Sequence, residues 1–230
     1  MKEELSRLTR IAGEKAVSNL ERSKVAVFGL GGVGGAALEA LVRSGVGSFL
    51  LVDNDRIAHS NLNRQIIALQ QNVGALKTQA AKERILAINP DAKVETYECF
   101  YLPDSEGSPL EGCDFVIDAI DTVAGKIRLI EECREKGIPL ISSMGTGNKF
   151  DPSRLRITEL EKTSVCPLCR VMRKEMKDRG IRSVTVLFSD EEPRKPADGG
   201  RTPGSFMPVT ACAGLMIAGY VLRKLMEKDA

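Results

Sequence analysis

The stretch KVAVFGLGGVGGAALEALVRSG, residues 24–45, limits the possible folds more than any other part of the sequence. Gly29, Gly31 and Gly34, with Gly32 as an extra glycine, follow a short apolar segment and open a segment of helical periodicity. This is the context of a nucleotide-binding strand–turn–helix unit, in which glycines let phosphate oxygens approach backbone N–H groups at the helix N-terminus. The alternative is a tight turn without a ligand. The glycine pattern does not separate a nicotinamide cofactor from ATP.

Apolar strands and helical segments alternate through the first 150 residues, which predicts an α/β fold with a parallel sheet covered on both faces. We expect strands at 24–29, 48–53, 93–99, 115–121 and 138–145, and helices at 34–45, 75–89 and 125–137. Residues 1–22 are expected to form two short turns. The predicted fold class is a doubly wound, mostly parallel sheet.

The pattern changes after residue 150, where polar and apolar residues alternate. We expect a strand at 154–160, a helix at 166–180, a strand at 182–188 and a final helix starting near Pro208. Residues 189–205 are rich in charge, glycine and proline, which predicts a mobile loop. The sequence therefore suggests a nucleotide-binding domain, 1–150, and a C-terminal extension of the same sheet, 151–230, with a substrate-facing helix.

Composition excludes several classes of protein. A hydrophobic content of 43% and a charged content of 28% are typical of a soluble globular protein. No apolar run follows the N-terminal MKEELSR, and the longest apolar run, Val209 to Leu222, is too short to span a bilayer. The six cysteines are expected to be free thiols. We expect a cytoplasmic protein without a membrane partner.

Polar residues after the second strand favour ATP over a dinucleotide. Asp53 ends that strand, where a carboxylate can accept ribose hydroxyls. Asn61, Arg64 and Lys77 follow, and cations of this kind suit a triphosphate whose leaving pyrophosphate accumulates charge. An isolated Arg or Lys would more often be a solvated surface charge. Asp55 fits a loop cap as well as a ligand contact.

The fourth strand supplies two further acids in VIDAID. Asp118 and Asp121 fall at its carboxyl end, where open parallel sheets bind ligands. We expect Asp121 to hold Mg²⁺ between the phosphates. Asp118 could equally cap the next helix.

At this point the chain resembles the ubiquitin-activating-type (ThiF/MoeB-like) adenylating enzymes, a family that activates carboxylates as acyl adenylates. GLGGVG, VDND, SNLNRQ, GALK and DAID occur in the order and spacing of that family, over roughly residues 5–150. The resemblance implies a Rossmann-like ATP site formed by Gly29, Gly31, Gly32, Gly34, Asp53, Asp55, Asn61, Arg64 and Lys77. It implies Gly32 beside the α-phosphate, Asp121 on the metal, and Arg10 reaching into the partner subunit's site of a homodimer.

Within that family, the segments RLTRIAGEKA, NRQI, VIDAIDTV and IPLISSMGTGNKFDPSRL are similar to those of the tRNA threonylcarbamoyladenosine dehydratases. The resemblance implies that the modified adenosine's carboxylate attacks ATP, and that the carbamoyl group on the same side chain then closes a ring and expels AMP. Because that nucleophile is tethered to the electrophile, no catalytic cysteine is needed. tRNA would be the substrate, and a sulfur-transfer protein a further partner.

Two other functions stay open. The first is adenylation of the C-terminal glycine of a ubiquitin-like sulfur carrier, and the second is nucleotide sensing without pyrophosphate release. Carrier activators usually hold zinc with two C-x-x-C pairs, but here Cys166 and Cys169 form one pair and Cys212 stands alone. We therefore expect no zinc and a buried, unreactive Cys212. His59, the only histidine, is expected to be an exposed loop residue.

A basic segment is the candidate RNA surface. Residues 162–182 hold seven basic and two acidic residues, a net charge of +5 in a chain of net +2. Four of the basic residues fall on one helical face, and Val171 and Met172 are expected to pack inward. The alternative is a solvated helix face. The predicted RNA-binding residues are Arg170, Arg173, Lys174 and Lys177.

Overall fold

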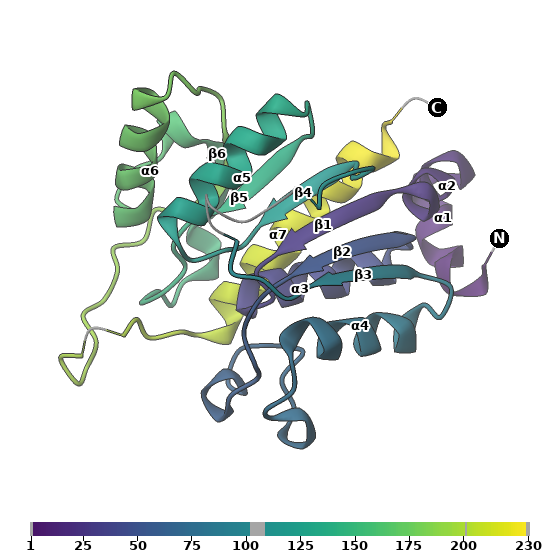
Figure 1. Ribbon diagram of the computed structural model, residues 1–230, viewed down its shortest axis with the longest axis horizontal. Coiled ribbons are helices and arrows are strands. Elements are labelled where there is room, and N and C mark those ends of the chain that lie inside the picture. The colour runs from purple at the N-terminus through teal and green to yellow at the C-terminus, as the bar shows by residue number, and fades with distance from the viewer. Residues whose placement is uncertain (1, 102–108, 201, 229–230) are drawn as a thin grey trace.

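The computed structural model describes residues 2–101, 109–200 and 202–228, which form one seven-stranded sheet with helices on both faces (Figure 1). The strand order is β3-β2-β1-β4-β5-β7-β6, and every neighbouring pair is parallel except β6 with β7. The predicted α/β, Rossmann-like fold is confirmed. The strands are β1 (Lys24–Phe28), β2 (Ser48–Val52), β3 (Lys93–Tyr97), β4 (Phe115–Asp118), β5 (Leu140–Ser143), β6 (Leu155–Glu159) and β7 (Thr185–Ser189).

Helices cover both faces of this sheet, which explains why its central strands are continuous apolar runs. Val25 and Val27 of β1 pack on the side of α3, α4 and α7, whereas Ala26 and Phe28 pack on the side of α5. A third cluster joins α5 to α6 and β7. The helices that pack on the sheet and its C-terminal extension are α3 (Gly32–Arg43), α4 (Lys77–Ile88), α5 (Val123–Glu135), α6 (Pro167–Asp178) and α7 (Met207–Met226).

The N-terminal segment forms helices, so the prediction of two short turns was wrong. α1 (Ser6–Ala12) and α2 (Glu14–Arg22) meet at Gly13, whose φ of 85° breaks the helix. Val17 and Leu20 of α2 are buried, and α2 ends directly before β1. Both helices therefore lie at the amino ends of the strands, at the right of Figure 1.

α7 is longer than the apolar run in the sequence. Its 20 residues are long and apolar enough to cross a membrane by length and composition, but half of that window is buried inside the protein. A Cβ on Gly214 would lie 2.3 Å from the carbonyl oxygen of Val33, so α7 packs closely against α3. α7 therefore packs as a core helix of the protein.

The C-terminal segment joins the same sheet through β7 and adds β6 at its edge. Residues 190–206, other than the undescribed residue 201, contain no helix or strand, and two backbone contacts hold this loop to Asn148. Arg194 N donates to Asn148 O at 2.8 Å, and Asn148 N donates to Gly204 O at 2.8 Å. Loop mobility and the domain division at residue 150 stay predictions.

Candidate active site

A cavity of about 270 Å³ opens at the carboxyl edge of the sheet, where β1 and β4 lie side by side. Chain connections run in opposite directions from these two strands, and open α/β sheets bind ligands at such a point. The cavity collects most of the predicted binding residues: Gly29, Gly31, Gly32, Asp53, Asp55, Asn61, Arg64, Lys77 and Asp121.

Apart from the predicted RNA-binding residues, Gly34 and Arg10 are the predicted site residues outside the cavity lining. A Cβ on Gly34 would lie 1.8 Å from Gly29 O, so Gly34 permits the close approach of α3 to the turn. Arg10 is exposed on α1, at the opposite edge of the sheet from the cavity.

The turn after β1 requires glycine at its first position. Gly29 has a φ of 84°, and a Cβ there would lie 2.5 Å from Ala119 O in the turn after β4. The two turns therefore cross in contact, and β4 ends at Asp118 instead of continuing to residue 121 as predicted. Gly31 precedes α3, so N–H groups of the first turn of α3 border the cavity.

Asp53 is buried at the end of β2 and orders the loops around the cavity. Its Oδ2 accepts from Leu30 N at 2.6 Å, and its Oδ1 accepts from Asp55 N at 2.8 Å. Asp53 therefore performs the loop-capping role that the sequence suggested for Asp55. Each carboxylate oxygen has a further lone pair for a ribose hydroxyl.

The three predicted phosphate donors are held by short polar contacts. Lys77 begins α4, and its buried Nζ donates to Asp55 Oδ2 at 2.6 Å. Arg64 Nη1 donates to Ser60 O at 2.7 Å and to Asn63 Oδ1 at 3.0 Å. Asn61 Oδ1 accepts from Ala58 N at 3.0 Å, so the amide Nδ2 is the group left to donate.

Sequence reasoning missed two residues that line the cavity. The buried atoms Gln65 Oε1 and Thr122 Oγ1 have no hydrogen-bond partner among the described residues. A buried polar atom without a partner costs free energy, so both positions favour a polar ligand. Gln65 follows Arg64 directly within NRQI, and that position is its only signal in the sequence.

A buried ion pair supports the turn after β4, and Lys126 was also missed. The side chains of Lys126 and Asp118 are fully buried, with Nζ 3.1 Å from Asp118 Oδ1. Lys126 Nζ also donates to Ser143 O at 2.7 Å, and Ser142 Oγ donates to Asp118 Oδ2 at 2.5 Å. Asp118 Oδ1 accepts from Ile120 N at 3.1 Å, so it pairs with Lys126 and caps the turn.

Asp121 is the free carboxylate of the cavity. It is exposed, and it makes no hydrogen bond or ion pair with another described residue. Asp53 and Asp55 are already engaged by N–H groups and by Lys77. Mg²⁺ commonly takes one or two carboxylates together with phosphate oxygens and water, so Asp121 fits that donor set.

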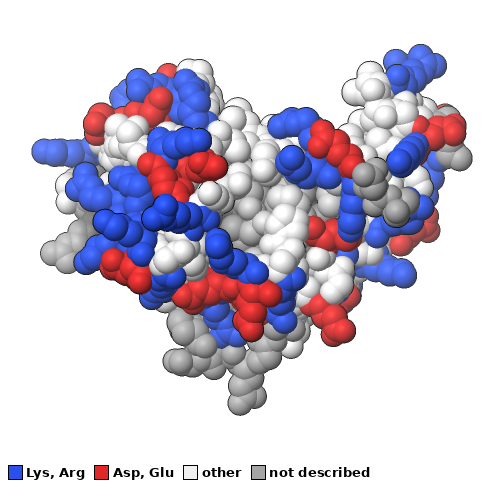
Figure 2. Space-filling view, turned by 90° about the horizontal axis from the view of Figure 1, so that it is seen from above, with Lys and Arg blue, Asp and Glu red and all other residues white. Residues whose placement is uncertain are grey.

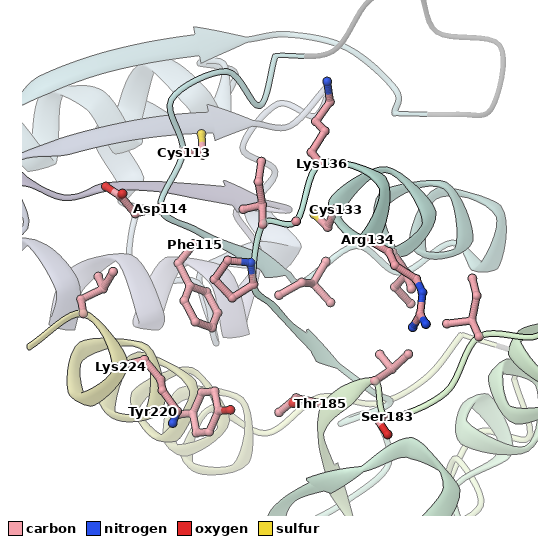
Figure 3. A pocket seen from close by; sticks show the side chains of 18 of the residues that line it. Cys113, Asp114, Phe115, Cys133, Arg134, Lys136, Ser183, Thr185, Tyr220 and Lys224 are labelled. Atoms are coloured by element: carbon pink, nitrogen blue, oxygen red, sulfur yellow. The ribbon is translucent and has the colours of Figure 1, made fainter. Parts of the chain in front are cut away.

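A larger hollow, of about 760 Å³, lies at the opposite, amino edge of the sheet (Figure 3). It is bordered by the segments before β4, β5 and β7 and by the end of α7, including Tyr220 and Lys224. The C-terminal ends of α5 and α7 face this edge, and helix C-termini disfavour anions. The glycine turn and Asp53 are absent from its lining. The nucleotide site is therefore assigned to the smaller cavity.

The sequence model of the ThiF family matches residues 4–230, which is nearly the whole chain. The chain belongs to the ThiF family. Two relatives named tRNA threonylcarbamoyladenosine dehydratase cover it almost completely. The one from Bacillus subtilis is 40% identical over 99% of this chain and 96% of its own. The one from Escherichia coli is 36% identical over 96% of this chain and 92% of its own.

The fold of this ThiF-family protein also matches a solved structure. The crystal structure of the E. coli tRNA N6-threonylcarbamoyladenosine dehydratase TcdA, in complex with ATP, superposes with a TM-score of 0.90 at 36% identity. The match covers 97% of this chain and 94% of that chain. The resemblance inferred from the sequence motifs is confirmed.

The cysteines of this ThiF-family protein are free thiols, as predicted. Cys166 and Cys169 are buried at the start of α6, and a hydrogen bond from Cys169 lowers the pKa of Cys166 below its ordinary value. Cys212 packs against the main core but is only half-buried, so the prediction of a buried Cys212 was wrong in part. His59 is exposed, as predicted.

We expect metal analysis of the purified protein to find no stoichiometric zinc, because two thiols do not close a tetrahedral zinc site. No third His, Cys, Asp or Glu ligand joins Cys166 and Cys169 in the described part of the chain. Cys212→Ser should keep full pyrophosphate exchange. One zinc per chain, or loss of exchange in that variant, would contradict the prediction.

Proposed function

We propose that this ThiF-family protein adenylates the carboxylate of threonylcarbamoyladenosine in tRNA and then closes it to a cyclic product, releasing pyrophosphate and AMP. The observation that supports this most directly is the single cavity that combines the glycine turn, Asp53 and three phosphate donors. The near full-length relatives with the dehydratase name support the substrate. The enzyme would work in the cytoplasm, with a sulfur-transfer protein as a further partner.

Different cavity residues would bind different parts of ATP. Asp53 would accept the ribose hydroxyls, and the N–H groups at the start of α3 would hold the α-phosphate near Gly32. Asn61, Arg64 and Lys77 would contact the β- and γ-phosphates, where charge accumulates as pyrophosphate leaves. Gln65 Oε1 and Thr122 Oγ1 would gain partners from ligand or bound water. Mg²⁺, held by Asp121, would neutralise phosphate charge.

The ion pair between Lys77 and Asp55 prepares the cation for this role. Lys77 Nζ lies 2.6 Å from Asp55 Oδ2, and the Asp55 side chain is exposed at the cavity. Lys77 would therefore be positioned before ATP arrives and would turn from carboxylate to phosphate. Positioning of this kind lowers the reorganisation needed at the moment of reaction.

ATP–pyrophosphate exchange, run with several candidate substrates, tests the proposal. Exchange should depend on tRNA that carries threonylcarbamoyladenosine and should not occur with a panel of ubiquitin-like carrier proteins. Exchange only with a carrier would support the first alternative function. ATP binding without exchange would support a nucleotide sensor. Tight NAD binding without ATP binding would exclude the proposed function and both alternative functions.

The family resemblance implies that Arg10 completes the site of the partner subunit. The position of α1, at the opposite edge of the sheet from the cavity of its own chain, is compatible with that role. Arg10→Ala and Asp121→Ala chains should each be inactive alone. Mixed after dissociation and reassociation, they should regain about a quarter of wild-type activity, since half of randomly formed dimers carry one intact site. No recovery in verified heterodimers would rule out this arrangement.

The basic face of α6 is the proposed RNA surface. In Figure 2, Lys and Arg gather on the left-hand lobe, where α6 lies in Figure 1. Met172 packs inward as predicted, but the prediction for Val171 was wrong, because its side chain is 43% exposed. Arg173 is half-buried, and Nη1 donates to Thr163 O at 2.9 Å. Arg173 thus has a structural contact besides its proposed role.

Reversing the charge of the exposed residues Lys174 and Lys177 to Glu should weaken tRNA binding and reduce its salt dependence. The slope of log affinity against log salt should fall by about one per lost phosphate contact. Kd for tRNA, measured across a salt series, checks this, and Kd for ATP serves as the control. Unchanged tRNA affinity and slope would show that α6 is not the RNA surface.

A further inference from the structure

Two exposed aromatic rings lie against each other beside the active site. Phe150 and Phe206 are 51% and 39% exposed, and their ring centroids are 5.1 Å apart at an interplanar angle of 35°. The guanidinium carbon of Arg194 lies 4.7 Å from the centroid of the Phe150 ring. We call these three side chains the aromatic platform. Phe150 comes from the segment after β5, Arg194 from the loop after β7, and Phe206 is the residue before α7.

The exposed ring of Phe150 is held by a dense set of hydrogen bonds around its backbone. The Glu191 carboxylate accepts from Phe150 N at 3.0 and 3.1 Å and from Asp151 N at 2.9 Å. The neighbouring Lys149 is buried, and its Nζ donates to Ser189 O at 3.1 Å and to Glu191 O at 2.6 Å. The fold thus fixes an apolar ring in solvent, which costs free energy unless a partner covers it.

The backbone next to the platform is linked to the nucleotide cavity through Thr210 and Asn63. Phe206 O accepts from Thr210 N one helical turn later, and a Cβ on Gly32 would lie 2.8 Å from Thr210 Oγ1. On the other side, Asn63 Nδ2 donates to Ser205 O at 3.3 Å. Asn63 also accepts from Arg64, which lines the cavity. Phe206 therefore lies one helical turn from Thr210, the residue that contacts Gly32, where the proposed function places the α-phosphate.

We infer that the aromatic platform stacks an unpaired nucleobase of the RNA substrate, next to the modified adenosine that enters the cavity. This rests on the proposed function. Aromatic rings and guanidinium planes are the groups on which splayed bases of single-stranded RNA stack. The platform is one ring pair wide, which suits a base and not an extended protein contact. The exposed Arg194 and Lys195 supply positive charge for the adjoining phosphates.

A fluorescent RNA tests the inference without depending on turnover. We would use an anticodon stem–loop that carries threonylcarbamoyladenosine, with 2-aminopurine at an adjacent nucleotide. Wild-type protein should quench its fluorescence by stacking. Phe206→Ala and Phe150→Ala should lose the quenching and raise Kd for the RNA by about 5- to 100-fold. Phe206→Trp should retain the quenching, whereas Phe206→Leu, which is apolar but cannot stack, should not.

Matched controls separate stacking from folding. Leu215→Ala removes a 52% exposed apolar side chain from α7, the helix that follows Phe206, and should leave quenching, RNA affinity and thermal stability unchanged. All platform variants should keep wild-type Kd for ATP. Quenching that survives in both Phe→Ala variants would overturn the inference, as would variants that lose binding of a carrier protein instead of RNA. Failure of the proposed function would appear separately, as wild-type protein without exchange on modified tRNA.

Discussion

Arg64→Ala should lower the turnover of the adenylation reaction about 10²–10³-fold, the scale of losing one positioned transition-state donor. The half-buried guanidinium lines the cavity, and its Nη1 is fixed by Ser60 O and Asn63 Oδ1. Because pyrophosphate gains charge only as it leaves, kcat should fall far more than the affinity for ATP. Initial rates of pyrophosphate release, with Kd for ATP measured in parallel, separate the two effects.

The loop before α4 offers a matched control for this experiment. Arg56 is a loop arginine like Arg64 but is exposed, its Nη1 donates to Gly74 O at 2.9 Å, and it does not line the cavity. Arg56→Ala should therefore change turnover by less than about threefold, in keeping with an ordinary surface substitution. Arg64→Lys should recover only part of the rate, since lysine keeps the charge but not the fork. Equal losses in Arg56→Ala and Arg64→Ala would contradict the assigned role.

Lys126→Met should destabilise the protein by about 3–5 kcal/mol, because it leaves the Asp118 carboxylate buried without its partner. Lys126 and Asp118 are fully buried, and the same network holds the turn that carries Asp121. Denaturant unfolding followed by circular dichroism gives the free energy of unfolding. Wild-type stability in this variant would show that the pair is not essential to the fold.

Two further variants make the comparison specific. Lys136→Met removes an exposed lysine just after the same helix and should change stability by less than about 0.5 kcal/mol. Asp118→Asn combined with Lys126→Met removes both charges, and it should recover a substantial part of the loss. Recovery in the double variant would identify the unpaired charge, and not lost packing around the lysine stem, as the cause.

The fold could be predicted largely because its central strands are apolar on both sides. β1, β2 and β4 have no polar face, so their place in a covered parallel sheet follows from composition alone. The N-terminal helices could not be predicted in this way. Their stability comes from contacts far along the chain, such as Asn19 Nδ2 with the carbonyl oxygens of Met226 and Lys228.

The active site likewise contains residues that could be predicted from the sequence and residues that could not. Residues that belong to local motifs, such as Asp53 and Arg64, could be found because their position relative to strand ends determines where they lie. Gln65, Thr122 and Lys126 could not, since glutamine, threonine and lysine in polar segments are normally solvated. Only the crossing of separate chain segments buries them. Val171 was placed wrongly because the four-residue basic stripe does not define how wide the buried face of α6 is.

The close packing of α7 on α3 has a consequence for biosynthesis. A nascent chain that has left the ribosome only as far as residue 206 already contains the glycine turn and every phosphate donor. It still lacks Val209, Ala213 and Ile217, which cover the apolar face of α3, and Thr210, which abuts Gly32. ATP binding should therefore arise late in translation, and a premature stop codon anywhere before α7 should yield an aggregation-prone fragment instead of a half-active one.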